Sequence, residues 1–121
     1  MPDQTKSQLA ERTKDFSLRV LRLCQALPEG RIEDMISRQL MRCGSSVGAN
    51  YRAARRARSP AEFRAKLGIV EEEADESMFW MELLVESKIV PKKRLEPLMD
   101  EANQILAMII ASINTSRRSK T

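Results

Sequence analysis

Apolar residues recur at alternating steps of three and four in four separate stretches of the chain, and this period constrains the fold more than any other feature. Steps of that size place side chains on one face of an α-helix, which turns once in about 3.6 residues. The four seams are Leu9, Thr13, Phe16, Val20, Leu23 and Leu27; Ile36, Leu40, Cys43, Val47, Asn50, Ala54 and Ala57; Phe63, Leu67, Val70, Ala74, Ser77, Met81 and Leu84; and Leu95, Leu98, Ala102, Ile105, Ile109 and Ser112. The sequence therefore predicts four amphipathic helices.

Helix-breaking and capping residues separate these seams. Pro28-Glu29-Gly30 ends the first helix, and the second is predicted over residues 31–58. Ser59-Pro60-Ala61-Glu62 combines a capping box with a proline at the first helical position. The third helix should therefore run over residues 60–87.

Short connections between the helices predict an all-α fold, an antiparallel up-and-down four-helix bundle with left-handed crossings. Residues 1–116 should form this single four-helix-bundle domain. Residues 117–121 form a basic C-terminal tail that we expect to fray.

Gly44 and Gly48 lie four residues apart inside the second predicted helix. Each costs about 1 kcal/mol relative to alanine in a helix, so a packing contact must compensate. Small side chains let two helix backbones approach closely, and we expect a neighbouring helix to pack there. A ligand-cradling loop is the alternative, but no strand precedes the segment and its spacing is neither GxGxxG nor a P-loop.

The third and fourth predicted helices are apolar over more than one stripe. Their additional apolar residues are Met78, Phe79, Trp80 and Leu83 on the third, and Met99, Leu106, Ile110 and Ile113 on the fourth. A four-helix bundle needs one inward face per helix, so the surplus favours a buried contact between copies of the chain. A wide core face covered by the monomer is the alternative.

The chain contains no histidine, which removes the commonest general base and the commonest metal ligand. We therefore expect no enzyme activity, no catalytic residue, no metal site, no cofactor and no small-molecule substrate. The two cysteines are not spaced as a metal or redox pair and should be buried, reduced thiols. Residues 1–16 are too polar for a signal peptide, and no apolar run is long enough to cross a membrane. We expect a cytoplasmic protein with no membrane partner.

An acidic cluster lies on the third predicted helix and consists of Glu71, Glu72, Glu73, Asp75 and Glu76. A solvated helix face is the simplest interpretation. Because Glu73 and Glu76 flank seam residues, a second interpretation is an interhelix polar network that fixes the register of the bundle. That network would comprise Ser45, Ser46, Asn50, Glu73 and Glu76.

Arginines form a stripe on the second predicted helix, on the side opposite Val47. The candidate nucleic-acid-binding residues on and beside this stripe are Arg38, Arg42, Arg52, Arg55 and Arg56. The stripe would extend about 27 Å at 1.5 Å per residue, long enough to follow several phosphates. A solvated face, or ion pairs with the acidic helix of a neighbouring subunit, would explain the same arginines. Tyr51 is the only aromatic residue nearby for base stacking.

Residues 42–52, RCGSSVGANYR, and residues 79–84, FWMELL, resemble the bacterial four-helix-bundle family named after 23S rRNA intervening-sequence proteins. Between them, residues 59–69 fit the family pattern S-x-x-[DE]-F-x-x-K-L-x-I and residues 73–76 fit E-A-x-E. The chain departs from the family at three positions, where Glu, Lys and Leu are usual: Ala53, Glu72 and Met81. The first departure weakens any role for a carboxylate on the second helix.

This resemblance implies a four-helix bundle and a ring-shaped homo-oligomer, commonly a pentamer, with no established activity. The family name refers to genes within rRNA intervening sequences and does not imply a ribosomal protein. The family is also similar in architecture to the basic pentameric accessory proteins of diversity-generating retroelements, which associate with a reverse transcriptase and nucleic acid. That similarity is one of fold and is a weak guide to function.

Two functions are compatible with these observations. The first is a non-enzymatic homo-oligomer that binds RNA, DNA or a nucleoprotein partner through the arginine stripe. The alternative is a scaffold or interaction protein without nucleic-acid binding, whose arginines serve subunit contacts. The net charge of +4 permits the first function without requiring it.

Overall fold

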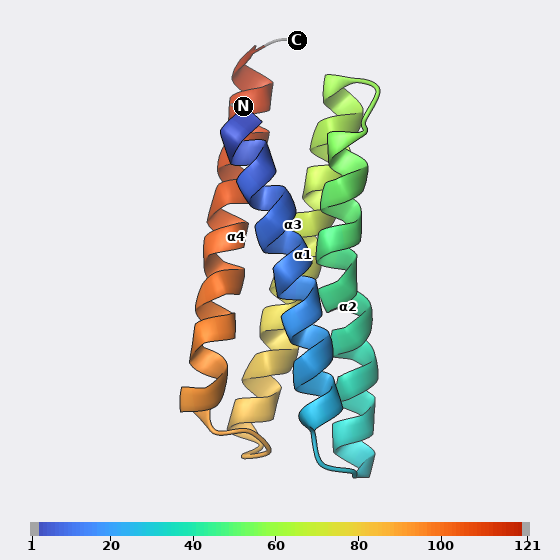
Figure 1. Ribbon diagram of the computed structural model, residues 1–121, viewed down its shortest axis with the longest axis vertical. Coiled ribbons are helices and arrows are strands. Elements are labelled where there is room, and N and C mark those ends of the chain that lie inside the picture. Colours follow the sequence, from blue (N-terminus) through green and yellow to red (C-terminus); the bar gives the residue numbers. More distant parts are fainter. Residues whose placement is uncertain (1–2, 120–121) are drawn as a thin grey trace.

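The computed structural model describes residues 3–119, which form four α-helices and no strand. These are α1 (Asp3–Ala26), α2 (Arg31–Arg55), α3 (Pro60–Glu86) and α4 (Lys92–Ser119) (Figure 1). The prediction of an all-α chain with four helices is confirmed. Residues 117–119 of the predicted tail continue α4, and residues 120–121 lie outside the described residues. The left-handed sense of the helix crossings stays a prediction.

Each helix packs against two others, so the four helices form a closed ring in cross-section. The helix pairs whose backbones pack side by side along the described residues are α1 with α2, α2 with α3, α3 with α4, and α1 with α4. Figure 1 shows the α1–α2 and α3–α4 connections at one end of the bundle. The α2–α3 connection lies at the other end, beside the ends of α1 and α4 that lead to the two termini.

The predicted seams supply most of the core, and one position of α2 is corrected. Tyr51 is fully buried, whereas the seam residue Asn50 is half-buried. The Tyr51 hydroxyl donates a hydrogen bond to the Lys6 carbonyl at 3.3 Å, which satisfies its polar end. Thr13, the polar residue in the first seam, is buried and donates to the Leu9 carbonyl of its own helix at 2.6 Å. Both hydroxyls therefore enter the core with a partner.

Helix α2 ends at Arg55, three residues earlier than predicted. The amides of Arg56 and Ala57 donate to carbonyls three residues back, at 3.1 Å each, so the last turn tightens before the chain leaves the helix. The capping box explains the early end: Ser59 Oγ accepts from the Glu62 amide at 3.0 Å, and Glu62 Oε2 accepts from the Arg58 amide at 2.8 Å. These bonds begin α3 and turn the chain away from α2.

The expected close approach at the two α2 glycines is confirmed, and the neighbour is α1. A Cβ added at Gly44 would lie 2.5 Å from Val20 Cγ1, and one at Gly48 would lie 3.2 Å from the Thr13 carbonyl oxygen. The hydroxyl of Ser17 lies between the glycines, donating to the Gly44 carbonyl at 2.7 Å and accepting from the Gly48 amide at 3.0 Å. The glycines are therefore needed for space and not for a turn.

Helices α1 and α4 close the ring with a less extensive contact and a polar clamp. Arg12 Nε and Nη2 donate to the two carboxylate oxygens of Glu101 at 2.9 and 2.6 Å, and Nη2 also donates to Gln104 Oε1 at 2.8 Å. The hydrogen bonds to Glu101 raise the pKa of Arg12. A two-point pair of this kind fixes the orientation of both side chains.

No helix within residues 3–119 combines the length and apolarity that crossing a membrane requires. The two cysteines, Cys24 and Cys43, are buried free thiols, and burial raises the pKa of each.

Alanine substitutions at two glycines separate packing from helix propensity. We expect Gly44→Ala to lower the free energy of unfolding by about 1–3 kcal/mol, the usual cost of overpacking, because its Cβ would collide with Val20. At Gly68 no atom lies within 4 Å of an added Cβ, so Gly68→Ala should raise the same free energy by about 0.5–1 kcal/mol. Urea unfolding followed by circular dichroism measures both changes. Equal stabilisation by the two substitutions would contradict the close approach of α1 and α2.

Candidate nucleic-acid interface

The five candidate arginines lie along the outward face of α2, and all of them are exposed to solvent. The Gly44–Gly48 side of α2 faces α1 and Val47 faces the core, so the arginine stripe is left pointing outward. The structure nevertheless divides the stripe into three parts with different surroundings.

Three of the arginines border a hollow between α1 and α2. This hollow has a volume of about 760 Å³, and its charged lining consists of Lys14, Arg52, Arg55, Arg56 and Glu11. The floor of the hollow is formed by small residues: Ala10, Ser45, Gly48 and Ala49. Four cations face one carboxylate here, so the hollow is an anion-attracting surface.

Lys14 is a member of this site that the stripe did not include. It belongs to α1, and only the packing of α1 against α2 brings it beside Arg52. Its signal in the sequence is weak, because it is one of several charged residues on the solvent side of the first seam. Arg38 does not border the hollow and lies further along α2, toward the α1–α2 connection.

Arg42 is held away from the hollow by α3. Its Nη2 donates to Glu76 Oε2 at 2.7 Å and to Gln39 Oε1 at 3.3 Å, and Trp80 Nε1 donates to the same Glu76 oxygen at 3.2 Å. The Arg42 side chain is 60% exposed, so this ion pair adds at most about 1 kcal/mol to stability. The ion pair matters more for the direction of the side chain, because Arg42, a predicted nucleic-acid-binding residue, points toward a carboxylate.

The members of the predicted interhelix network form no hydrogen bond with one another across α2 and α3 in the described part of the chain, and Glu76 pairs instead with Arg42, which the network did not include. Asn50 Nδ2 donates to the carbonyl and the hydroxyl of Ser46 at 3.0 and 2.6 Å, and Ser45 Oγ donates to the Arg42 carbonyl at 3.2 Å. These short side chains bond within α2, as serine and asparagine commonly do in helices, and do not reach α3. Glu73 Oε2 is buried without a hydrogen-bond partner. Burial, followed by the charge of Glu76, raises the pKa of Glu73.

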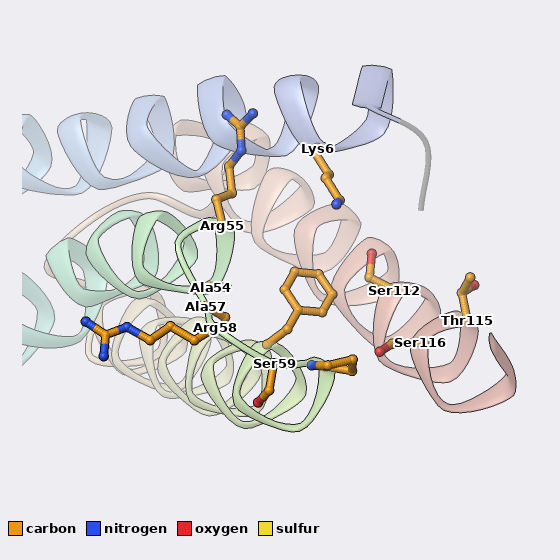
Figure 2. Close-up of a pocket in the computed structure, with 11 residues that line it drawn as sticks. Lys6, Ala54, Arg55, Ala57, Arg58, Ser59, Ser112, Thr115 and Ser116 are labelled. Carbon is orange, nitrogen blue, oxygen red and sulfur yellow. The ribbon is translucent and has the colours of Figure 1, made fainter. Parts of the chain in front are cut away.

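The basic surface continues from the hollow to the end of the bundle. Arg55 borders both the α1–α2 hollow and a second pocket of about 390 Å³. Lys6 and Arg58 also line this second pocket, and Lys6 Nζ lies 5.7 Å from the centre of the Phe63 ring. Figure 2 shows the Lys6 side chain directed into this pocket, while the side chains of Arg55 and Arg58 extend away from it. Cations therefore follow the surface from the last turn of α2 to the α2–α3 connection.

Metal-binding clusters are absent from the part of the chain that the structure describes: no three His, Cys, Asp or Glu side chains are placed to hold one ion. The four packed helices and the exposed arginines of α2 define the class of the molecule: it is a four-helix bundle with one basic helix face.

Comparison with known proteins gives the family within this class. The chain belongs to the 23S rRNA-intervening sequence protein family, whose sequence pattern matches residues 5–111. It is similar to a crystal structure of a protein with unknown function from the S23 ribosomal protein family of Bacteroides thetaiotaomicron VPI-5482. The two share 30% identity over 91% of this chain and 98% of that chain, with a TM-score of 0.86. No curated protein shows significant similarity to the chain.

The titration of Tyr51 tests its place in the core behind the basic face. Burial raises the pKa of Tyr51 to about 12 from an ordinary value of about 10, and the charge of Arg55 opposes the rise. Since the folded state binds the phenolic proton more tightly, stability is fully present below pH 10 and should fall as the pH rises from 10 toward 12. Tyr51 is the single tyrosine, so near-ultraviolet absorbance of tyrosinate reports it alone. Tyr51→Phe is the control and should lose this part of the pH dependence. A folded-state midpoint near 10 would contradict the burial.

Proposed function

We propose that this chain is a non-enzymatic cytoplasmic protein that assembles into a homo-oligomer of antiparallel, left-handed up-and-down bundles and binds nucleic acid, or a nucleoprotein partner, through the basic face of α2. One observation carries the proposal: Arg52, Arg55, Arg56 and Lys14 gather around one open hollow with a single carboxylate. A surface of this kind attracts phosphates.

The state of the arginines supports this function. Among residues 3–119, ion pairs involve only two arginines, Arg12 and Arg42. Arg38, Arg52, Arg55 and Arg56 therefore keep their guanidinium groups available to an anion. Arginine binds phosphate in a two-point geometry, which suits a nucleic-acid backbone.

The surface favours backbone contacts over base recognition. Tyr51 is fully buried, so it offers no ring on which a base can stack. Contacts with phosphates position a protein without reading sequence. Binding should therefore tolerate different sequences, and repetition of a weak basic face around a homo-oligomer would strengthen it through avidity.

A scaffold without nucleic-acid binding is the second candidate, and the Arg42–Glu76 pair favours it. That pair shows that an α2 arginine can be satisfied by an α3 carboxylate. If a neighbouring subunit supplied similar carboxylates to the other arginines, they would belong to the assembly.

The test is a quadruple charge reversal that leaves Arg42 in place, because Arg42→Glu would face Glu76. The variant is Arg38→Glu/Arg52→Glu/Arg55→Glu/Arg56→Glu, and its matched control with the same net charge is Lys66→Glu/Lys88→Glu/Lys92→Glu/Lys93→Glu. We expect wild type and control to retard an RNA hairpin in a native gel and to lose affinity steeply as salt rises. The arginine variant should bind at least tenfold more weakly.

Size-exclusion chromatography with light scattering on the same proteins completes the test. An arginine variant that keeps the wild-type mass but loses RNA binding supports the nucleic-acid function. Equal loss of RNA binding in the arginine variant and the lysine control would mean that binding depends on net charge alone and not on the α2 arginines. A wild type that ignores RNA at low salt, or an arginine variant that falls to the mass of one chain, would favour the scaffold.

A further inference from the structure

We propose that copies of this chain join through a knob and a socket: Phe79, surrounded by carboxylates on α3, inserts into the arginine-lined hollow between α1 and α4 of the next copy. The inference rests on the homo-oligomer in the proposed function and names the surfaces that would build it. A second copy of this chain is the occupant of the hollow.

The knob is an exposed aromatic ring in an acidic setting. Phe79 is 50% exposed and packs edge-on against Trp80, with ring centres 5.1 Å apart. The residues at three, four or seven positions from Phe79, which share its helix face, include five carboxylates: Glu72, Asp75, Glu76, Glu82 and Glu86. Four of these are exposed and enter no ion pair along residues 3–119, and only Glu76 pairs with Arg42.

The socket has the opposite charge and an apolar floor. It is a hollow of about 280 Å³ between α1 and α4, and its lining consists of Arg19, Arg22, Arg94, Leu23, Leu95 and Leu98. No carboxylate lines it, and its three arginines form no ion pair in the described part of the chain. An aromatic ring on the leucines with carboxylates over the arginines would satisfy both surfaces.

The knob and the socket of one chain cannot meet. Helix α3 packs side by side with α2 and α4 over the described residues, the Lys6–Phe63 contact between α1 and α3 lies at the opposite end of the bundle, and Phe79 faces outward from α3. Two knobs facing each other would also bring like charges together, which disfavours a two-fold dimer through this surface. The proposed contact is head-to-tail between different surfaces, which is the arrangement that builds closed rings.

The two surfaces lie at the same level of the bundle, as a ring of side-by-side copies requires. Figure 1 shows α1 ending, α3 ending and α4 beginning at one end of the molecule. Phe79 precedes the end of α3 by seven residues, Arg19 precedes the end of α1 by seven, and Leu98 follows the start of α4 by six. At 1.5 Å per residue all three lie within about 11 Å of that end.

Reciprocal charge reversal tests the contact. The socket variant is Arg19→Glu/Arg22→Glu/Arg94→Glu, and the knob variant is Glu72→Lys/Glu82→Lys/Glu86→Lys. Light scattering should give the mass of one chain for each variant, with helical circular dichroism retained. An equal mixture should assemble again to a mass well above that of one chain, because each knob then finds a socket of opposite charge on a copy of the other variant. This rescue separates a broken interface from a failure to fold.

Two controls sharpen the result. Lys66→Glu/Arg117→Glu/Arg118→Glu changes the net charge as much as the socket variant and should keep the wild-type mass. Phe79→Ala should weaken assembly at least tenfold, whereas Ile110→Ala, at an apolar residue that is 43% exposed on α4, should not.

Three outcomes would overturn the contact: variants that keep the wild-type mass, a mixture that stays at the mass of one chain, or a wild type that is itself monomeric. The last would also remove the homo-oligomer from the proposed function. Loss of RNA binding in a socket variant of unchanged mass would assign these arginines to nucleic acid and overturn the contact as well. RNA binding lost only on reversal of the α2 arginines has no bearing on the contact, so the two proposals fail separately.

Discussion

The close approach of α2 to α1 at Gly44 and Gly48 is the constraint on which the rest of the molecule depends. Helix α1 packs against these glycines, and the Ser17 hydroxyl is hydrogen-bonded to the Gly44 carbonyl and the Gly48 amide. Helix α2 therefore cannot rotate about its axis without a collision. Its rotation decides which side chains face solvent, because neighbouring positions differ by about 100°. The core position of Tyr51 and the outward position of the arginines therefore have one cause. A bulkier residue at Gly44 would change the basic face as well as the packing.

Charge is segregated on the outer surface of the bundle, and this segregation gives the surface its functional character. Cations concentrate around α2 and at the α1–α4 hollow, and carboxylates concentrate on the outward face of α3. Within a single chain the two signs meet across helices at Arg12–Glu101 and at Arg42–Glu76 among the described residues. Mixed charges would neutralise each other locally and stay solvated. Separated charges produce fields that reach another molecule, within a screening length of about 8 Å at physiological ionic strength.

The sequence predicts the fold well because helix period and capping are local properties. The Ser59 capping box, the four seams and the pair of glycines at 44 and 48 each involve residues within a few turns of one another. The candidate site is predicted less well, because it depends on which helices become neighbours. Lys14 joins the arginines only after α1 packs on α2, and Arg42 turns toward Glu76 only after α3 does. The spacing predicts Asn50 in the seam, but the neighbouring Tyr51 buries far more apolar area and takes the core position.

Assembly and nucleic-acid binding make opposite demands on an arginine, and the division of the arginines between two surfaces meets both. An arginine in a subunit contact must be desolvated and paired, whereas one that binds phosphate must stay open until the ligand arrives. The hollow between α1 and α4 has leucines beneath its arginines, which suits burial. The hollow between α1 and α2 has alanine, serine and glycine beneath its arginines, and no leucine lines it. A hydrated phosphate chain needs no apolar floor. The leucines therefore favour the proposed assembly contact at the first hollow, whereas the small residues leave room for a hydrated phosphate chain at the second.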